Sequence, residues 1–300
     1  MTDLSVIIVS YDSAGCISKC LQSILREPRV GRVIVIDNAS ADNSQALLRD
    51  WAAREPRVQL VENTRNLGFA VAVNQGLQRV ESEFTLLLNP DCVVGANTIR
   101  RVLEVLRSQP TTGMAGCMIR NVDGSEQRGC RRYSPTLQRV VARFTRREQT
   151  DGERTAGFEQ HLEPVPEAPT EVEAISGAFM CVRRTAIEQV GLLDEGYFLH
   201  AEDLDWCLRF RKAGWRILFV PDVQAVHDRG FSSRQHLMTV HWHMHRGMLR
   251  YYGKFLAPES SALINVAVAV GIGTRYLFLL PLIPLRALRF RMRARARRGR

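Results

Sequence analysis

The sequence predicts an α/β protein with a mostly parallel sheet and helices on both faces, and three observations lead to this class. Short apolar runs alternate with amphipathic stretches over the first 120 residues, which is typical of strands connected by helices. Several apolar runs end in polar or acidic residues, as strands do at the ligand-binding edge of an open sheet. With 300 residues and 45% hydrophobic content, the chain has enough apolar side chains for one large core.

The amino-terminal part supplies the strands and helices of this sheet in alternation. Its apolar runs predict strands at 4–10, 33–36, 57–61, 84–88 and 113–119. The amphipathic stretches predict helices at 14–26, 43–53, 69–80 and 96–107. The segment Ser40-Ala41-Asp42-Asn43 is a typical helix start and supports the second of these helices.

The carboxyl-terminal part is less regular. Residues 146–173 are polar and rich in Glu, Pro and Gly without periodicity, which indicates a loop or insert. Beyond it we expect an ordered segment at 175–182, a helix at 184–190, a helix from 202 to about 213, a strand at 215–220 and a helix at 234–255. The acids at 202–205 favour a helix start, because negative charge stabilises a first helical turn. These elements complete a predicted domain over 1–255.

Cysteine usage and charge narrow the class of protein. The seven cysteines are scattered and contain no Cys-x-x-Cys pair, which favours a reducing compartment. The first strand follows Met1-Thr2-Asp3 directly, so no signal peptide is expected. Of the 41 basic residues nine lie in 261–300, so 32 basic residues accompany 31 acidic ones in 1–260. The domain is nearly neutral, and no nucleic-acid footprint is expected on it.

The last 45 residues, 256–300, are predicted to be a membrane-associating tail. Ala262 to Leu285 is mostly apolar and long enough to span a bilayer, which takes about 20 residues. Arg275 lies in its middle, however, and a charge at the bilayer centre costs about 2.5–3.5 kcal/mol. A single span, an interfacial or re-entrant attachment and a soluble helix pair all remain open. In the first two cases the arginines belong on the anionic, cytoplasmic face of the inner membrane.

Three predicted strands end in residues that suit a nucleotide and a metal ion. The strand at 84–88 leads into Asn89-Pro90-Asp91, and the strands at 4–10 and 33–36 lead into Tyr11-Asp12 and Asp37-Asn38. A carboxylate at such an edge can hold a divalent cation, and the cation a diphosphate. The alternatives are that Asp91 caps the next helix, that Asp37 forms a turn and that Tyr11 only closes the sheet edge.

Later motifs add candidates that are weak one by one. Free backbone amides of the turn Asn66-Leu67-Gly68-Phe69-Ala70 would meet a phosphate or ribose, unless it is a plain loop-to-helix junction. Glu202 and Asp203 form a carboxylate pair in which one member can act as a general base, or merely a solvated helix start. His227 follows a strand and can be a metal ligand or a polar surface residue.

A zinc site is not favoured by the histidines near the carboxyl end, which are His236, His241, His243 and His245. Only His241 and His245 share a helical face, and no Cys or acid lies at ligand spacing. The same helix carries four residues that would instead face an anionic acceptor: Arg246, Arg250, Tyr251 and Tyr252.

The order of these motifs along the chain is specific. In sequence they are 5–11, 35–44, 66–70, 88–91, 176–178, 202–205 and His227. This set resembles the inverting GT-A glycosyltransferases of family 2, particularly their rhamnosyltransferase-like branch, over about 4–255. The resemblance implies a Rossmann-like GT-A fold, which binds nucleotide-diphosphate sugars.

The resemblance also implies a role for each matching residue. Tyr11 and Asp37 would contact the base, and Asn66 and Asn89 the ribose or phosphates. Asp91 would be the last acid of the family's Asp-x-Asp metal motif, whose first acid is replaced here by Asn89. Its partner on Mg²⁺ or Mn²⁺ would be His227. Asp203, beside Glu202, would be the catalytic base, and the acceptor pocket would be bordered by Gly177, Ala178 and Trp206.

The expected function is transfer of a sugar, with dTDP-L-rhamnose as the favoured donor, to a hydroxyl of a lipid-linked envelope saccharide with inversion. A UDP- or GDP-sugar is the alternative donor. A nucleotidyltransferase would need an amino-terminal Gly-rich loop with Arg or Lys, and an NAD(P) oxidoreductase a Gly-x-Gly-x-x-Gly; neither motif follows the first strand. The rival outside enzymes is a membrane adaptor or nucleic-acid binder that acts through the basic tail.

Overall fold

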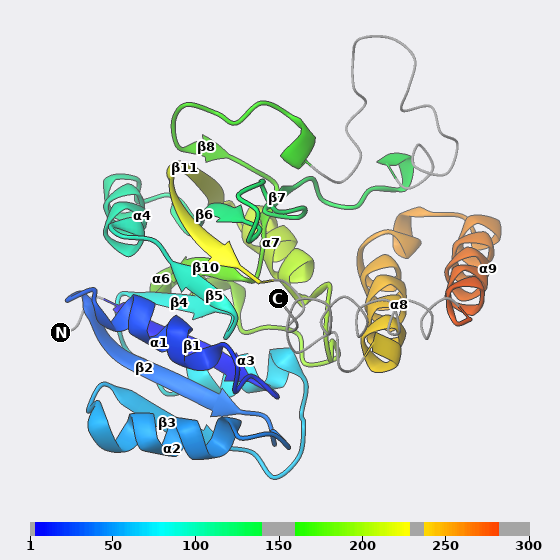
Figure 1. The fold of residues 1–300 in the computed structure, drawn as a ribbon. Helices are drawn as coiled ribbons and strands as arrows, with labels where there is room; N and C mark the ends of the chain where they lie inside the picture. The colour runs from blue at the N-terminus through cyan, green and yellow to red at the C-terminus, as the bar shows by residue number, and fades with distance from the viewer. Residues whose placement is uncertain (1–3, 140–159, 229–236, 282–300) are drawn as a thin grey trace.

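The central sheet of the protein, seen in a computed structural model that describes residues 4–139, 160–228 and 237–281, has nine strands (Figure 1). Eight follow one another in the order β3 (Val58–Glu62), β2 (Val30–Asp37), β1 (Leu4–Ser10), β4 (Phe84–Leu88), β10 (Phe179–Arg183), β6 (Thr112–Arg120), β11 (Arg216–His227) and β5 (Cys92–Val94). The ninth, β8 (Thr170–Glu171), pairs with β11. A separate two-stranded sheet joins β7 (Arg131–Arg132) to β9 (Ala174–Ile175).

The first four strands form a parallel half-sheet whose tips meet at one edge. β1 pairs in parallel with β2 and with β4, in registers that set Ser10 opposite Asp37 and Ile8 opposite Leu88. β1 and β4 are buried along their whole length, as strands covered by helices on both faces must be. The predicted sheet edge therefore exists, and the residues that follow these strands meet there.

The second half of the sheet brings a late segment of the chain to the same edge. β10 runs antiparallel between β4 and β6, and β11 runs parallel to β6. An irregularity between Val220 and Gln224 bends β11. Its last residues then pair with β5, so that His227 lies opposite Cys92.

Helices cover the sheet, and two more lie beside it. The covering helices are α1 (Ile17–Leu25), α2 (Ser44–Arg54), α3 (Phe69–Leu77), α4 (Thr98–Ser108), α6 (Arg184–Val190) and α7 (Glu202–Lys212). A single core of buried side chains includes Phe84, Phe179, Trp206, Phe210 and Phe219. The long helices α8 (Leu237–Phe255) and α9 (Ala262–Leu279) lie side by side at one end of the molecule, joined through a short 3₁₀ turn at Ala257–Glu259 (Figure 1).

The predicted elements of the first 120 residues are confirmed to within three residues at each end, and the strand at 84–88 matches β4 in both bounds. The predicted strand at 215–220 is too short, because β11 continues to His227 after its bend. Four short strands were not predicted, namely β5, β7, β8 and β9. Strands of two or three residues carry no periodicity, so only their pairing partners reveal them.

Three predictions fall partly outside the described residues. Of the loop at 146–173, only 160–173 are described, and they contain a 3₁₀ turn at Gln160–Leu162 and the strand β8. The helix predicted at 234–255 is described from Leu237, and the apolar stretch at 262–285 forms α9 as far as Leu279.

Candidate active site

A pocket of about 340 Å³ opens at the edge where the strand tips meet. Nine of the eleven residues predicted for the site line it, and they come from six parts of the chain: Tyr11, Asn66, Asn89, Asp91, Gly177, Ala178, Glu202, Asp203 and His227. The structure does not bring Asp37 or Trp206 to the pocket wall.

The tip of β1 is held by hydrogen bonds to the loop after β2. Asp12 adopts a left-handed conformation (φ 48°), its carboxylate accepts the Ala41 amide at 2.7 Å, and its own amide donates to the Ser40 hydroxyl at 3.0 Å. These bonds connect the tip of β1 to the loop after β2. They hold the backbone next to Tyr11, which lines the pocket. Because they join residues 28 and 29 positions apart, the position of Tyr11 depends on both strands.

Asp37 is fully buried and serves this loop, which corrects its predicted place against the base. Its carboxylate accepts the Ser40 hydroxyl at 2.6 Å, the Ser40 amide at 3.0 Å and the Gln45 side chain at 3.0 Å. Its neighbour Asn38, which was not predicted, lines the pocket and donates to the side chain of Asn66 at 2.9 Å.

The turn before α3 is packed against the protein, and three of its backbone amides donate within it. The Leu67 amide donates to Asn38 at 3.1 Å, the Gly68 amide to Asn66 at 2.9 Å and the Phe69 amide to the Phe198 carbonyl at 2.7 Å. Gly68 has a φ of 87° and lies so close to Phe198 that a Cβ would be 2.7 Å from its carbonyl oxygen. These three amides are therefore engaged within the protein, while the Asn66 side chain lines the pocket.

Asp91 and His227 form a pair suited to a cation. The Asp91 carboxylate lies 3.0 Å from His227 Nε2, and both side chains are largely buried. Gln127 donates its amide to the His227 carbonyl at 3.1 Å, so its oxygen accepts from His227 Nδ1 at 2.6 Å. A neutral imidazole in this tautomer carries its lone pair on Nε2, which lies near Asp91 and 3.4 Å from the side-chain amide of Asn89. Two acceptors at that distance need a proton or a metal ion between them.

Cys92 lies beside this pair but is unsuited to be a ligand. Its sulfur lies within 4.8 Å of the ligand atoms of Asp91 and His227. The thiol, however, donates to the Ala178 carbonyl at 3.4 Å. Burial, together with the charge of Asp91, raises the pKa of the Cys92 thiol well above its usual value. Because metals bind the thiolate, the fitting donors are a carboxylate and an imidazole, to which Mg²⁺ or Mn²⁺ can add phosphate oxygens.

A second cluster, at the start of α7, contains the predicted base. Arg132 of β7 makes an ion pair with Asp203, whose carboxylate also accepts the amides of Leu204 at 2.8 Å and Gly177 at 3.3 Å. Burial by itself raises the pKa of Asp203, but the Arg132 guanidinium outweighs burial and holds that pKa below its usual value. Asp203 is thus ionised and fixed in orientation.

The pKa of Glu202 is shifted in the opposite direction from that of Asp203. Burial, reinforced by the charge of Asp203, raises the pKa of Glu202 to about 8. Its Oε2 atom is buried without a hydrogen-bond partner among the described residues. Two adjacent carboxyls whose pKa values are driven apart are typical of acid–base sites.

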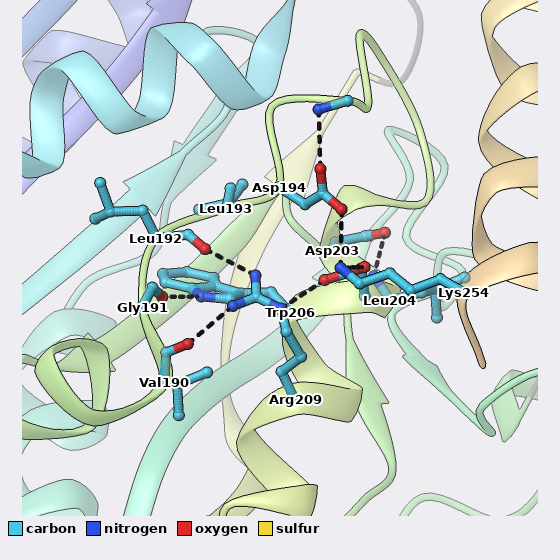
Figure 2. A network of polar contacts seen from close by, with 12 residues as sticks. Val190, Gly191, Leu192, Leu193, Asp194, Asp203, Leu204, Trp206, Arg209 and Lys254 are labelled. Carbon is cyan, nitrogen blue, oxygen red and sulfur yellow. Dashed lines mark hydrogen bonds and ion pairs between the residues drawn. The ribbon is translucent and has the colours of Figure 1, made fainter.

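Trp206 anchors α7 in the core, which corrects its predicted role at the acceptor. It is fully buried, and its indole donates to the Gly191 carbonyl at 2.9 Å. Arg209, one turn further along, donates to the carbonyls of Val190 and Leu192, and Lys254 of α8 bridges Asp194 and Asp205 (Figure 2). These contacts fix the helix whose first turn carries Glu202 and Asp203.

The histidines of α8 make contacts of other kinds. Within the described residues the only group with metal-ligand geometry is Asp91, Cys92 and His227. His243 stacks on Phe198 at 4.0 Å, and His245 Nδ1 donates to the His241 carbonyl at 2.7 Å. His236 lies outside the described residues.

This sheet order, with one antiparallel strand beside β4 and an acidic pocket at the strand tips, defines a GT-A glycosyltransferase fold. The chain belongs to the glycosyltransferase-like family 2, whose family model matches residues 2–248. It is 32% identical over 252 residues to the N-acetylglucosaminyl-diphospho-decaprenol L-rhamnosyltransferase of Mycobacterium tuberculosis, covering 78% of each chain. It is 24% identical over 259 residues to the rhamnosyltransferase WbbL of Escherichia coli, covering 83% of this chain and 92% of that one.

Solved structures agree on the fold. The mannosyltransferase PcManGT of Pyrobaculum calidifontis, in complex with GDP-Man and Mn²⁺, aligns with a TM-score of 0.58 at 18% identity, over 98% of this chain and 75% of that one. GalNAc-T7 with UDP, GalNAc and Mn²⁺ aligns with a TM-score of 0.56 at 19% identity, over 75% of this chain and 43% of that one. At these identities the likeness concerns the fold alone.

Proposed function

We propose that this glycosyltransferase transfers L-rhamnose from dTDP-L-rhamnose to a hydroxyl of a lipid-linked saccharide, with inversion. The observation that carries the proposal is the meeting, in one pocket, of a cation-binding pair, Asp91 and His227, with an ionised carboxylate, Asp203. The sugar and the acceptor class are supported by the names of the relatives, one of which acts on a diphospho-decaprenol acceptor.

Each part of the pocket has a step in this reaction. A Mg²⁺ or Mn²⁺ ion held by Asp91 and His227 would neutralise the charge of the departing diphosphate. Asp203 accepts the proton of the acceptor hydroxyl as that oxygen attacks the anomeric carbon, and positive charge develops on the sugar as its bond to the diphosphate breaks. Because one displacement occurs, the anomeric configuration inverts.

The base is Asp203 in this proposal, and Glu202 supports it. Arg132 keeps Asp203 ionised at neutral pH, so the carboxylate is ready to accept a proton. Glu202 is protonated at that pH, which leaves a single negative charge beside Arg132. Tyr11, Asn38 and Asn66 line the nucleoside side of the pocket in this assignment, and Gly177 and Ala178 the acceptor side.

We place the reaction at the cytoplasmic face of a membrane. A lipid-linked acceptor requires contact with lipid, and 261–300 combine an apolar stretch with nine arginines and no acid, a composition attracted to anionic leaflets. No sequence feature on the catalytic domain favours nucleic acid as the partner, given its near-neutral charge.

A donor panel tests the proposal. Purified protein is mixed with dTDP-L-rhamnose, UDP- and GDP-sugars and a short-chain lipid diphosphate N-acetylglucosamine, with Mg²⁺, Mn²⁺ or chelator, and nucleoside diphosphate release is measured. We expect turnover with dTDP-L-rhamnose that needs the metal, and a product of inverted anomeric configuration by NMR. Turnover with only a UDP- or GDP-sugar would replace the donor, and no turnover with any donor would refute the assignment.

A further inference from the structure

The outer face of α9 is mostly apolar, and apart from the exposed Thr274 its polar side chains point inward. The stripe toward α8 contains Asn265, Arg275 and Tyr276, which are partly buried. The opposite face exposes Leu263, Val266, Val270, Leu277 and Phe278 by 61 to 80%. A surface helix of a water-soluble protein shows the opposite arrangement, with its apolar face toward the core and its polar face toward solvent.

Contacts along the whole helix hold α9 against α8 in this orientation. The Tyr252 hydroxyl donates to Asn265 at 2.7 Å near one end, and Trp242 packs on Tyr276 at 5.5 Å near the other. Between them Arg275 donates to His245 Nε2 at 3.0 Å. His245 gives its Nδ1 proton to the His241 carbonyl, so Nε2 is free to accept. Burial and the charge of Arg275 lower the pKa of His245, which keeps the imidazole neutral.

Lipid is the environment that fits this surface. No described segment covers the apolar residues of α9, whose mean hydropathy is 1.7 with none of the helix buried. In the sequence the same segment is followed by eight arginines in 286–300, which favour an anionic leaflet over an apolar protein partner. On α8 three further large apolar residues are exposed, Met238, Trp242 and Leu249, by 50, 46 and 39%.

The contacts with α8 disfavour a position in which α9 crosses the bilayer. Arg250 and Lys254 bind Asp194 of the catalytic domain at 2.7 and 2.8 Å, so α8 is tied to that domain. A spanning α9 would draw α8 with it, including Arg246 and Arg250, and each charge at the bilayer centre costs about 2.5–3.5 kcal/mol. A helix that lies in the interface keeps these charges in the headgroup region, where Trp242 is also favoured.

We propose that α8 and α9 form a hairpin that lies in the plane of the membrane surface, with the outer face of α9 in the lipid. Thr239 and Val240 of α8 also line the active-site pocket. The hairpin therefore brings the pocket to the lipid surface, where, if the proposed function is right, the sugar of a lipid-linked acceptor reaches Asp203 while its lipid stays in the leaflet.

Vesicle flotation of full-length protein tests the lipid contact. Phosphatidylglycerol–phosphatidylethanolamine vesicles are used in 0.5 M salt, which screens the arginines. We expect the double change Leu277→Glu and Phe278→Glu to reduce the bound fraction at least about tenfold, since each residue loses burial in lipid. Val122→Glu, at an apolar residue that is 71% exposed in the catalytic domain, is the matched control and should bind as the unchanged protein. If thermal melting shows the double variant to be unfolded, Leu263→Glu at the other end of α9 takes its place.

Protease access tests the orientation. A tag after Arg300 should be cleaved in inside-out membrane vesicles together with the catalytic domain, because an in-plane hairpin leaves both on one side. Protection of the tag, or flotation of the α9 variants equal to that of the unchanged protein, overturns the proposal. Transfer to a short-chain, water-soluble acceptor should be the same in all variants. If the unchanged protein shows no such transfer, the proposed function is refuted. The hairpin is then tested by flotation and protease access alone.

Discussion

Single residues acquire their chemical state from neighbours that are distant in the sequence. Asp203 and Glu202 are adjacent carboxyls on one helical turn, yet their pKa values move in opposite directions. The difference arises because Arg132, 71 positions away, binds one of them and not the other. The proposed roles of Asp203 as an ionised base and of Glu202 as its neutral neighbour therefore depend on the Arg132 guanidinium.

The proposed base is tested by Asp203→Asn, which preserves shape but cannot accept a proton. We expect turnover to fall at least about 10²-fold, the usual scale for loss of a general base. Nucleotide binding should be unchanged, since Asp203 is not part of the cation pair. Rapid-quench kinetics and nucleotide titration measure the two separately. Near-normal turnover would assign the role to another carboxylate, with Glu202 the first candidate.

Arg132→Gln tests whether the guanidinium sets the pKa of the base. Removing an opposite charge in contact raises a carboxyl pKa by about 1–3 units, so the acidic limb of the pH profile of kcat/KM should move upward by that amount. Arg132→Lys should restore part of the shift. Arg139→Gln removes an equal charge from a pair with Glu173, 3.0 Å apart and away from the pocket, and should leave the limb in place. An unshifted limb in Arg132→Gln would mean that Arg132 does not act on the base.

Glu202 gives a prediction for stability against pH. Its pKa is about 8 in the fold against an ordinary value of 4.5. Between these values the unfolded chain has lost a proton that the fold retains, so stability falls as the pH rises from about 4.5 to 8. Glu202→Gln removes this loss. We compare the Tm of this variant with that of the unchanged protein at pH 5 and at pH 8. The Tm difference in favour of the variant should be larger at pH 8 by at least about 2 °C. The exposed Glu167→Gln should show no such difference, and an equal Tm offset at both pH values for Glu202→Gln would contradict the raised pKa.

At the scale of elements, the candidate cation site joins two strands that meet only in the finished sheet. Asp91 lies in the turn between β4 and β5, and His227 ends β11. The bend in β11 and its pairing with β5 bring the two within 3.0 Å. The loop between β6 and β7 then contributes Gln127, which orients the imidazole.

Asp91→Ala tests this junction against its neighbour Cys92. Without the carboxylate, the increase in nucleoside diphosphate affinity caused by Mn²⁺ or Mg²⁺ should be largely lost. Cys92→Ser should keep that increase, because the Cys92 thiol is protonated and directed at the Ala178 carbonyl. Calorimetric titration with and without metal measures both. Unchanged metal dependence in Asp91→Ala would exclude Asp91 as a ligand, and its loss in Cys92→Ser would make the sulfur part of the site.

At the scale of the whole molecule, the catalytic domain and α9 differ in how their apolar side chains are covered. The domain has one continuous buried core, whereas no residue of α9 is fully buried. Helix α8 connects the two: Lys254 binds Asp194 and Asp205 of the domain, and Tyr252 and His245 bind α9. The ion pairs of Lys254 do not involve α9, so α8 can remain docked when α9 is removed.

A chain cut after Ser260 tests this division. We expect it to be soluble at low salt and to bind the donor nucleotide with unchanged affinity, because none of the described residues beyond Val240 lines the pocket. Sedimentation with vesicles and thermal shift with dTDP measure these two properties. If the shortened chain still sedimented with anionic vesicles, attachment would reside in the catalytic domain. If it lost nucleotide binding, 261–300 would be required for the pocket.

The sequence by itself determined most strands of the sheet, its main helices and nine of the residues that line the pocket. Alternating apolar and amphipathic stretches are local signals of strand and helix, and the ends of parallel strands meet at one edge whatever their loops do. Tyr11, Asn89 and Asp91 were placed in this way. The order of the motifs indicated membership of glycosyltransferase family 2, which the family model confirms.

Only the tertiary structure decided the direction and charge of the functional side chains. Asp37 turns into the loop after β2, Trp206 turns into the core, and Gln127 reaches His227 across 100 positions. It also decided that Arg275 is bound by His245 on the inner face of α9. The physical reason is that secondary structure follows from periodicity over a few residues. Hydrogen bonds, burial and pKa values depend instead on which distant side chains are packed together.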